Sequence, residues 1–172
     1  MPSINELNEQ EFLEKTKQYK GIIIRITRLY CNNAEDLKDL RQEIMYQLWK
    51  SFPSFRGASS FSTWMYRIAV NTCLLNIKKN KRSRIIERVN IFPEIVDNSQ
   101  YTLENKEKSN IFYSAIQKLT PAEKAIIFYH LEELSHREIA EQLGISEVNA
   151  RVKLKRIKDK LKNIIKIEGY EF

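Results

Sequence analysis

Apolar residues recur at helical spacing along the first half of the chain, which is typical of helices with one buried face. The first stripe consists of Phe12, Tyr19, Ile22, Ile23, Ile26 and Leu29. The second stripe consists of Leu37, Leu40, Ile44 and Leu48. They predict helices over residues 9–30 and 35–50. A turn over residues 51–57 contains Pro and Gly and ends the second helix, and a third helix is predicted from Ser60 to about Lys79.

The pattern changes in the middle of the chain and later becomes helical again. Residues 89–108 mix Asn, Ser, Pro and charges of both signs without a sustained period, which is typical of a linker. A helix is then predicted over residues 110–119. Thr120, Pro121 and Glu123 provide an N-cap, a first-turn proline and the partner of a capping box, so they predict the start of another helix.

The stretch that follows has the pattern of a helix-turn-helix motif. Ser135 and Glu138 form a second capping box at the start of a short helix. Gly144 supplies the left-handed conformation that ends this helix, and Ser146 caps the next one. The residues expected to hold the two helices together are Ile139, Ala140, Leu143, Ile145, Val148, Val152 and Leu154.

The two helical blocks predict an all-α fold of two small domains. We expect the first over residues 1–84, a flexible linker over residues 85–109 and the second over residues 110–172. The composition agrees, because the chain has only four Gly and four Pro and is rich in helix-forming residues. The N-terminus is polar, and Arg25 interrupts the most apolar run, so we expect neither a signal peptide nor a membrane span, and a cytoplasmic location.

Basic charge is concentrated near the end of the second block. The net charge is +7, and residues 151–166 hold eight Lys and Arg with Asp159 as the only acid. A recognition helix in the major groove of DNA needs such basic and polar side chains. The candidate DNA-contacting residues are Asn149, Arg151, Val152, Lys153 and Arg156. The alternative is a solvated charged face on an ordinary helical hairpin, which explains the lysines better than it explains the two capped helices.

The third predicted helix combines aromatic, basic and amide side chains. Arg67, Asn71 and Lys78 are spaced four and seven residues apart and therefore share one helix face, which the basic cluster over residues 78–84 extends. This combination suits unpaired DNA, whose bases can stack and form hydrogen bonds. The candidate residues for such a contact are Trp64, Arg67, Asn71, Lys78 and Arg82. For Trp64, a position in the core is the alternative.

Both blocks resemble regions of one protein family. Residues 39–57 and 60–71 contain a D-L-x-Q-E helix, a tryptophan near its end, an F-x-G turn and an F-x-T-W-x-Y-R-I-A-x-N helix. They closely resemble region 2 of extracytoplasmic-function (ECF, group 4) RNA polymerase sigma factors of the sigma-70 family. Residues 119–161, with L-T-P-x-E and L-S-x-x-E-I-A-E-x-L-G-I-S, resemble region 4 of that family. The resemblance implies a helical bundle followed by a helix-turn-helix domain, and a subunit without catalytic activity or cofactor.

The resemblance also implies partners and residue roles. The second predicted helix would bind the clamp coiled coil of core RNA polymerase through Asp39, Leu40, Gln42, Glu43, Tyr46, Gln47 and Trp49. The third would bind the −10 element of promoter DNA and hold a flipped base, while the second block would read the −35 element and contact the polymerase flap. An anti-sigma factor is a further expected partner. The acidic linker residues Glu94, Asp97 and Glu104 would mimic nucleic acid inside the polymerase.

The sequence departs from the family pattern in two places. A second acidic register, Glu35 and Asp36, precedes Asp39, so either aspartate can take the polymerase-contact role. In the recognition helix, Ala150 and Val152 stand where many relatives have polar residues. The −35 sequence that this chain prefers therefore cannot be taken from its relatives.

Two other functional classes make different predictions. A stand-alone helix-turn-helix regulator would bind duplex DNA and dimerise through its first block, which leaves the basic and amide residues of the third helix unexplained. An enzyme would need a catalytic constellation, but His130 and His136 have no partnered carboxylates and no Gly-rich phosphate loop accompanies them. Cys31 and Cys73 form no C-x-x-C pair and fall among apolar residues, so we expect buried thiols and no metal site.

Overall fold

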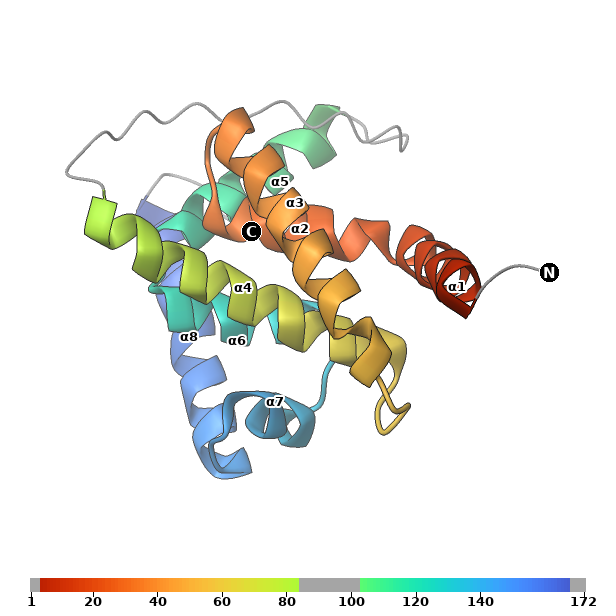
Figure 1. Ribbon diagram of the computed structural model, residues 1–172. Helices are drawn as coiled ribbons and strands as arrows, with labels where there is room; N and C mark the ends of the chain where they lie inside the picture. Colours follow the sequence, from red (N-terminus) through yellow and green to blue (C-terminus); the bar gives the residue numbers. More distant parts are fainter. Residues whose placement is uncertain (1–3, 84–102, 168–172) are drawn as a thin grey trace. The chain divides into compact units, whose positions relative to one another are not determined.

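The computed structural model describes the backbone of residues 4–83 and 103–167 and the side chains of residues 9–79 and 108–167. The chain divides into two compact units, Met1–Pro93 and Glu94–Phe172 (Figure 1). Every element in the described ranges is helical, which confirms the predicted all-α fold. The boundary between the units falls inside the predicted linker, of which residues 85–102 lie outside the described ranges.

The first unit is a bundle built on three mutually packed helices. Its elements are α1 (Ile4–Gln18), α2 (Lys20–Tyr30), α3 (Ala34–Ser51), the 3-10 turn η1 (Phe52–Ser54) and α4 (Phe61–Ser83). In Figure 1, α2 packs against α3 and α4, these two pack against each other, and α1 packs against α2. The predicted stripe of α3 is buried in this core. Its fully enclosed side chains include Ile26, Ile44, Leu48 and Met65.

The prediction of a single helix over residues 9–30 is wrong. The helix is interrupted at Tyr19, between α1 and α2. Tyr19 has φ −106° and ψ 15°, and its N–H donates to the carbonyl of Thr16, three positions back (3.2 Å). The Thr16 hydroxyl donates to the carbonyl of Phe12 (2.8 Å), a bond of the kind that bends helices. Gly21, a weak helix former, follows the break. The apolar stripe crosses this break, so its period alone does not reveal it.

The second unit is organised around its last helix. Its elements are α5 (Leu103–Gln117), α6 (Pro121–Leu131), α7 (His136–Leu143) and α8 (Glu147–Ile167). The helix α8 packs against α5, α6 and α7. Because α5 begins at Leu103, residues 103–109 are helical, and the prediction that they belong to a flexible linker is wrong.

The predicted caps of the second unit are confirmed. Thr120 and Glu123 form a complete capping box at the start of α6, and Ser135 and Glu138 form another at the start of α7. Gly144 ends α7 with φ 65° and ψ 37°, in the left-handed region that side chains with a Cβ disfavour. Local sequence therefore determines where these helices begin and end.

The contact between α7 and α8 differs from the prediction at two valines. Val148 is 69% exposed and Val152 is 42% exposed, so neither holds the two helices together. The buried face of α8 is formed by Ala150, Leu154, Ile157, Leu161 and Ile165. These positions are three or four residues apart, and Val148 and Val152 fall outside that stripe. Ile139, Ala140 and Leu154 are buried as predicted, whereas Leu143 and Ile145 are half-buried.

Candidate nucleic-acid and partner interfaces

The residues predicted to bind polymerase occupy three different environments on α3. Those that line a groove beside α4 are Asp39, Glu43 and Gln47. Those on the neighbouring exposed face are Gln42, Tyr46 and Trp49, of which Tyr46 is 57% exposed and Trp49 is 41% exposed. Leu40 is 2% exposed and lies in the core, so its side chain cannot contact a partner without local unfolding. The sequence pattern placed all seven on one helix but did not separate these faces.

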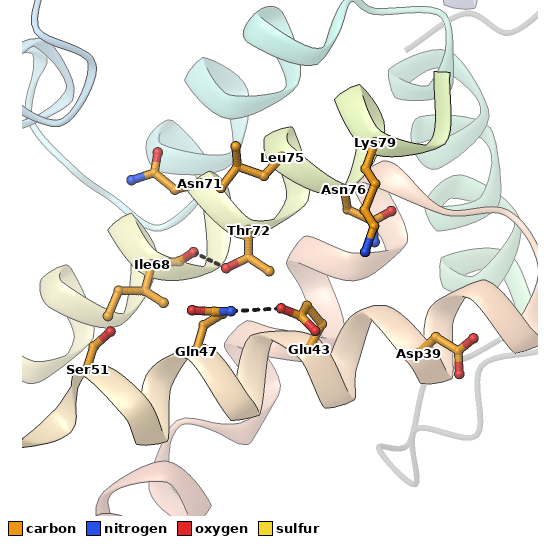
Figure 2. A pocket seen from close by; sticks show the side chains of 10 residues that line it. All are labelled: Asp39, Glu43, Gln47, Ser51, Ile68, Asn71, Thr72, Leu75, Asn76 and Lys79. Carbon is orange, nitrogen blue, oxygen red and sulfur yellow. Dashed lines mark hydrogen bonds between the residues drawn. The ribbon is translucent and has the colours of Figure 1, made fainter. Parts of the chain in front are cut away.

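The groove between α3 and α4 has a volume of about 430 Å³. In Figure 2, Glu43 and Gln47 point from α3 toward α4, and the Gln47 amide donates to Glu43 Oε1 (2.8 Å). The wall from α4 consists of Ile68, Asn71, Thr72, Leu75, Asn76 and Lys79. Leu75 is 64% exposed. The lining thus combines two carboxylates, three amides and Lys79 with the exposed apolar side chain of Leu75, a mixture that suits contact with another protein.

Several residues of this groove were not singled out from the sequence. Leu75 and Asn76 have no role predicted from the sequence, although they follow Asn71 and Thr72 at spacings of three and four. Lys79, one turn further on, belongs to the predicted basic cluster over residues 78–84. That spacing is the signal that could have identified them, because it places them on one face of a helix. The opposite wall of the groove is formed by Asp39, Glu43 and Gln47 of α3. Only the folded structure shows that these residues lie next to those of α4.

The two candidate aspartates of α3 are engaged differently. Asn33 caps α3, and its side-chain oxygen accepts a hydrogen bond from the Asp36 N–H (2.7 Å). The Asn33 amide also donates to the Asp36 carboxylate (2.6 Å). The hydrogen bonds at the start of α3 thus engage Asp36, whereas Asp39 is exposed and lines the groove.

An aromatic cluster surrounds the start of α4 and includes Trp64. The Trp64 ring centroid lies 5.1 Å from that of Phe55 and 5.2 Å from that of Phe61. Phe52 contributes an edge-on contact to Phe61 at 6.3 Å. Trp64 is half-buried, so it packs in this cluster and also keeps part of its surface accessible. The structure thus gives Trp64 a packing role without removing it from the surface.

The other predicted −10 residues lie further along α4. Arg67, Asn71 and Lys78 are all exposed. Asn71 is one of the residues that line the groove, where Figure 2 shows its side chain beside Leu75. Arg82 belongs to α4, but its side chain lies outside the described residues. The side chains of Glu94, Asp97 and Glu104, predicted as a nucleic-acid mimic, also lie outside them.

All five predicted −35 residues are exposed on α8. The helix is capped by Ser146, whose hydroxyl accepts a hydrogen bond from the Asn149 N–H (3.2 Å). Val152 and Arg156 stand one turn apart in the middle of the exposed surface, with Arg151 on one side and Lys153 on the other. Arg151 forms an ion pair with Glu147 (3.2 Å), and the side chains of both are more than two-fifths exposed. Such a pair contributes little to stability and leaves the arginine able to change partners.

A second groove, of about 310 Å³, follows one side of α8 next to α7. It is lined by His136, Arg151, Leu154, Lys155, Lys158, Asp159 and Lys162. The three lysines belong to the basic stretch over residues 151–166, whose Lys and Arg side chains are predicted from the sequence to meet DNA phosphates. The spacing of the three lysines places them on one side of α8. His136, which also lines this groove, belongs to α7.

An ion pair ties the other side of α8 to the start of α6. The Lys160 ammonium donates to both carboxylate oxygens of Glu123, at 2.9 and 3.1 Å. The same carboxylate accepts from the Thr120 N–H (2.8 Å) to complete the capping box. Burial raises the pKa of Glu123, but the hydrogen bonds from Lys160 and Thr120 outweigh it and hold this pKa below its usual value.

Among the described residues, no three His, Cys, Asp or Glu side chains gather as they would in a metal site. His130 is half-buried, and its burial, together with the charges of Lys158 and His136, lowers its pKa. Burial raises the pKa of the enclosed Cys73 thiol, which keeps it protonated. Cys31 is half-buried, so the prediction of full burial is wrong for this cysteine. Within the described ranges, no helix has the length and apolarity that crossing a membrane requires.

Comparisons with protein families match both units. Residues 16–83 match the model of sigma-70 region 2, and residues 109–161 match the model of sigma-70 region 4. The all-helical fold, the helix-turn-helix and the order of the two matches define the class, a protein built from sigma-70 regions 2 and 4.

Individual relatives of known identity show which family within this class the chain resembles. The ECF RNA polymerase sigma-E factor of Haemophilus influenzae is 30% identical over 81% of this chain and 79% of the relative. ECF sigma factor SigW of Bacillus subtilis is 25% identical over 90% of this chain and 89% of the relative. SigG of Mycobacterium tuberculosis is 25% identical over 90% of this chain, which spans about half (48%) of that relative's length. The chain belongs to the ECF RNA polymerase sigma factors.

Solved structures share the fold. The sigma factor RpoE of Bartonella quintana, in complex with the anti-sigma factor NepR, gives a TM-score of 0.66 at 17% identity, covering 90% of this chain and 98% of the other. CnrH, in complex with the cytosolic domain of CnrY, gives 0.63 at 16% identity, covering 94% and 91%. At these identities the likeness concerns the fold alone.

Proposed function

We propose that this chain binds core RNA polymerase, directs it to promoters through the −10 and −35 elements, and promotes opening of the DNA without catalysing a reaction itself. The observation that carries the proposal is the presence of both sigma regions, in order, on two separately packed helical units. A single factor with two such units can contact one promoter at two places. We place its action in the cytoplasm, where promoter DNA and polymerase meet.

The first unit is proposed to bind the polymerase clamp through α3. Two surfaces are available, the groove that contains Asp39, Glu43 and Gln47, and the face that carries Tyr46 and Trp49. The exposed aromatic face supplies apolar area, and the acidic groove supplies charge that selects a basic partner. Of the two aspartates, we assign the contact to Asp39, because Asp36 is bound at the helix start.

The helix α4 is proposed to hold the opened −10 element. Arg67, Asn71 and Lys78 are exposed, and the half-buried Trp64 ring offers a surface on which a base can stack. Extruding a base costs a few kcal/mol, and a pocket that binds the extruded base offsets this cost.

The helix α8 is proposed to read the −35 element as duplex. Its capped N-terminus presents Asn149, Val152 and Arg156 on the exposed side, where base edges in the major groove can be reached. Arg151 and Lys153 flank them. Contact of the same unit with the polymerase flap is a further proposal that rests on the family.

An anti-sigma factor is proposed as a regulator. RpoE and CnrH are both described in complexes, the first with the anti-sigma factor NepR and the second with the cytosolic domain of CnrY. The groove between α3 and α4 is one surface that such a protein could cover. Covering it would compete with polymerase.

Run-off transcription with purified core RNA polymerase tests the proposed function. Genomic fragments are transcribed with and without the purified chain, and the starts are mapped. We expect new, discrete start sites that depend on the chain, and we expect the chain to elute with core polymerase on gel filtration. If it binds duplex DNA but neither joins the polymerase nor changes its start sites, the stand-alone regulator is the correct function. The match of residues 16–83 to sigma-70 region 2 argues against that alternative.

A further inference from the structure

The second half of α1 packs against the aromatic cluster that surrounds the start of α4. Phe12 is buried, and its ring centroid lies 5.3 Å from that of Phe52 in η1. One turn further along, the Lys15 ammonium lies 5.5 Å from the centroid of the Phe61 ring, within the range of a cation–π contact. Tyr19, at the break between α1 and α2, adds a ring contact to Phe61 at 5.7 Å. Three side chains of this segment thus hold two rings of the cluster.

The two rings that α1 contacts are also neighbours of Trp64. The centroid of the Trp64 ring lies 5.2 Å from that of Phe61 and 6.4 Å from that of Phe52. A third ring beside Trp64, that of Phe55, belongs to the turn before α4, and residues 56–60 of this turn are exposed. Because the turn offers little packing, the orientation of the half-buried Trp64 ring depends on Phe52 and Phe61, and hence on α1.

We propose that Phe12 and Lys15 of α1 are positioning residues for strand opening. Through the two rings that they contact, they hold the Trp64 ring in the orientation in which an unpaired −10 base can stack on it. The inference rests on the proposed function and gives a role to residues outside the predicted −10 set, neither of which contacts DNA itself. Both also precede residues 16–83, which match the model of sigma-70 region 2.

The two contacts differ in their chemistry and can therefore be removed separately. The Phe12 and Phe52 rings meet edge to face at an interplanar angle of 61°, a geometry that aromatic pairs prefer and that fixes their relative orientation. Phe12→Leu keeps an apolar side chain but loses the ring. The Lys15 ammonium is attracted to the negative face of the Phe61 ring, and it also pairs with Glu11 one turn earlier (3.5 Å).

Fluorescence of Trp64 tests the positioning contact without polymerase. The chain has two tryptophans, so Trp49→Phe leaves Trp64 as the only one. In this background, Lys15→Gln and Phe12→Leu should shift the Trp64 emission to longer wavelength and increase its quenching by acrylamide, because a loosened ring is more exposed to water. Lys15→Arg keeps the cation and should retain the emission of the parent chain.

Opening of the −10 region tests the functional consequence. Full-length variants with both tryptophans are assembled with core RNA polymerase on promoter DNA, and permanganate reactivity of unpaired thymines gives the fraction of open promoter. Lys15→Gln should lower the equilibrium constant of opening by about two- to fivefold, the factor that corresponds to a cation–π contact of about 0.5–1 kcal/mol. Lys15→Arg should restore it. Binding to core polymerase and to upstream duplex should stay unchanged, which general unfolding would not allow.

Lys17→Gln is the matched control. It removes an exposed cation from the last turn of the same helix and should leave both the Trp64 emission and promoter opening at the values of the parent chain. Because Lys15 is partly exposed, Lys15→Gln covers the case that Phe12→Leu unfolds α1.

The two measurements separate the failure of this inference from the failure of the proposed function. If Lys15→Gln behaves like Lys17→Gln in both, α1 does not position Trp64 and the proposal is overturned, even when the unmodified chain supports run-off transcription. When the chain directs polymerase, a change in only one of the two measurements overturns it as well. If Trp64 responds to Lys15→Gln but the chain never directs polymerase, the positioning contact stands and the sigma-factor assignment fails.

Discussion

The two long helices proposed to contact DNA, α4 and α8, differ in what they expose. Basic residues occupy much of the accessible surface of α8 from Arg151 onward, and one side of it is a stripe of four cations. The described side chains of α4 instead expose Arg67, Asn71, Leu75, Lys78 and Lys79, beside the half-buried ring of Trp64. One face of α4 closes a groove with the acidic side of α3. One helix is suited to the high charge density of paired strands, and the other to bases and to a protein neighbour.

This difference shows how one chain can contact two states of DNA. Duplex DNA carries one negative charge for about every 1.7 Å of its axis, so a helix beside it gains from every added cation. Unpaired bases offer flat apolar faces and hydrogen-bonding edges, and aromatic and amide side chains recognise these better than charge alone. Variants that remove one property from one helix should therefore produce separable defects.

The largest expected effect on stability comes from truncating a buried side chain at the contact between α7 and α8. Ile139 is fully buried, and Ile139→Ala should lower the free energy of unfolding of the second unit by about 2–5 kcal/mol. Thermal and urea unfolding followed by circular dichroism measure the loss. The first unit, which has its own core, should unfold as in the unmodified chain.

The matched control for that change is Val148→Ala. Val148 is 69% exposed, so its truncation should change stability by less than about 0.5 kcal/mol. If both variants were destabilised equally, Val148 would belong to the helix contact after all, and the buried face of α8 described above would be incorrect.

A second pair of variants separates reading of duplex from opening of strands. Arg156→Ala should weaken binding to a duplex that carries the preferred upstream element by about 1–3 kcal/mol, because one base-reading contact is lost. Asn71→Ala should leave this binding unchanged and reduce opening of the −10 region, measured by permanganate reactivity of unpaired thymines in the polymerase complex. Equal defects of both kinds in either variant would contradict the division of roles between α8 and α4.

A third, smaller effect concerns the two left-handed turns that flank α7. Gly144 has φ 65°, and Gly144→Ala should cost about 1 kcal/mol because a Cβ disfavours this conformation. Glu133 has φ 63° without being a glycine, so Glu133→Gly should have the opposite sign and raise the melting temperature slightly. If Glu133→Gly were as destabilising as Gly144→Ala, the Glu133 side chain would hold the turn through contacts that outweigh its backbone strain.

The smallest expected effect is the pH-dependent loss in Glu123→Gln. Glutamine can still complete the capping box, but it removes the charge that Lys160 contacts. The pKa of Glu123 is lowered in the folded chain, so the carboxylate stabilises the fold above its usual value of 4.5, and this contribution disappears as the pH falls through the lowered pKa. We expect a loss of about 1 kcal/mol or less near pH 7 and almost none near pH 3, measured by urea unfolding.

Glu138→Gln provides the control for this prediction. Glu138 also completes a capping box and has a lowered pKa, but its hydrogen bonds in the described residues run to Ser135 beside it. A change that alters only the box should give a smaller pH dependence than one that also breaks a contact between α6 and α8. The reverse order would show that Lys160 contributes nothing measurable.

The helix ends of the second unit could be predicted from the sequence because their causes are local. A hydroxyl, a glutamate three positions later and a glycine specify the caps of α6 and α7 within a few residues. The break at Tyr19 is different, because the Thr16 hydroxyl bonds to its own helix backbone, which the apolar period does not record. The start of α5 at Leu103 was missed for a similar reason, since its first turns carry no sustained apolar stripe.

The candidate site could be predicted as a set of residues but not as surfaces. Periodicity placed Asp39, Gln42 and Tyr46 on one helix, and only the packing of α4 beside α3 assigns Asp39 to a groove and leaves Tyr46 on an open face. The distinction between Lys160 and Lys158 also depends on the fold. Their neighbours in sequence are alike, but Lys160 faces a carboxylate that is distant in sequence.

That shared carboxylate has a consequence for how the second unit opens. The oxygens of Glu123 complete the start of α6 and also bind the middle of α8. Fraying of the first turn of α6 would break this contact with α8, and movement of α8 would remove one partner of the carboxylate that caps α6. Amide protons of these two segments should therefore exchange with solvent at matching rates, as one cooperative element.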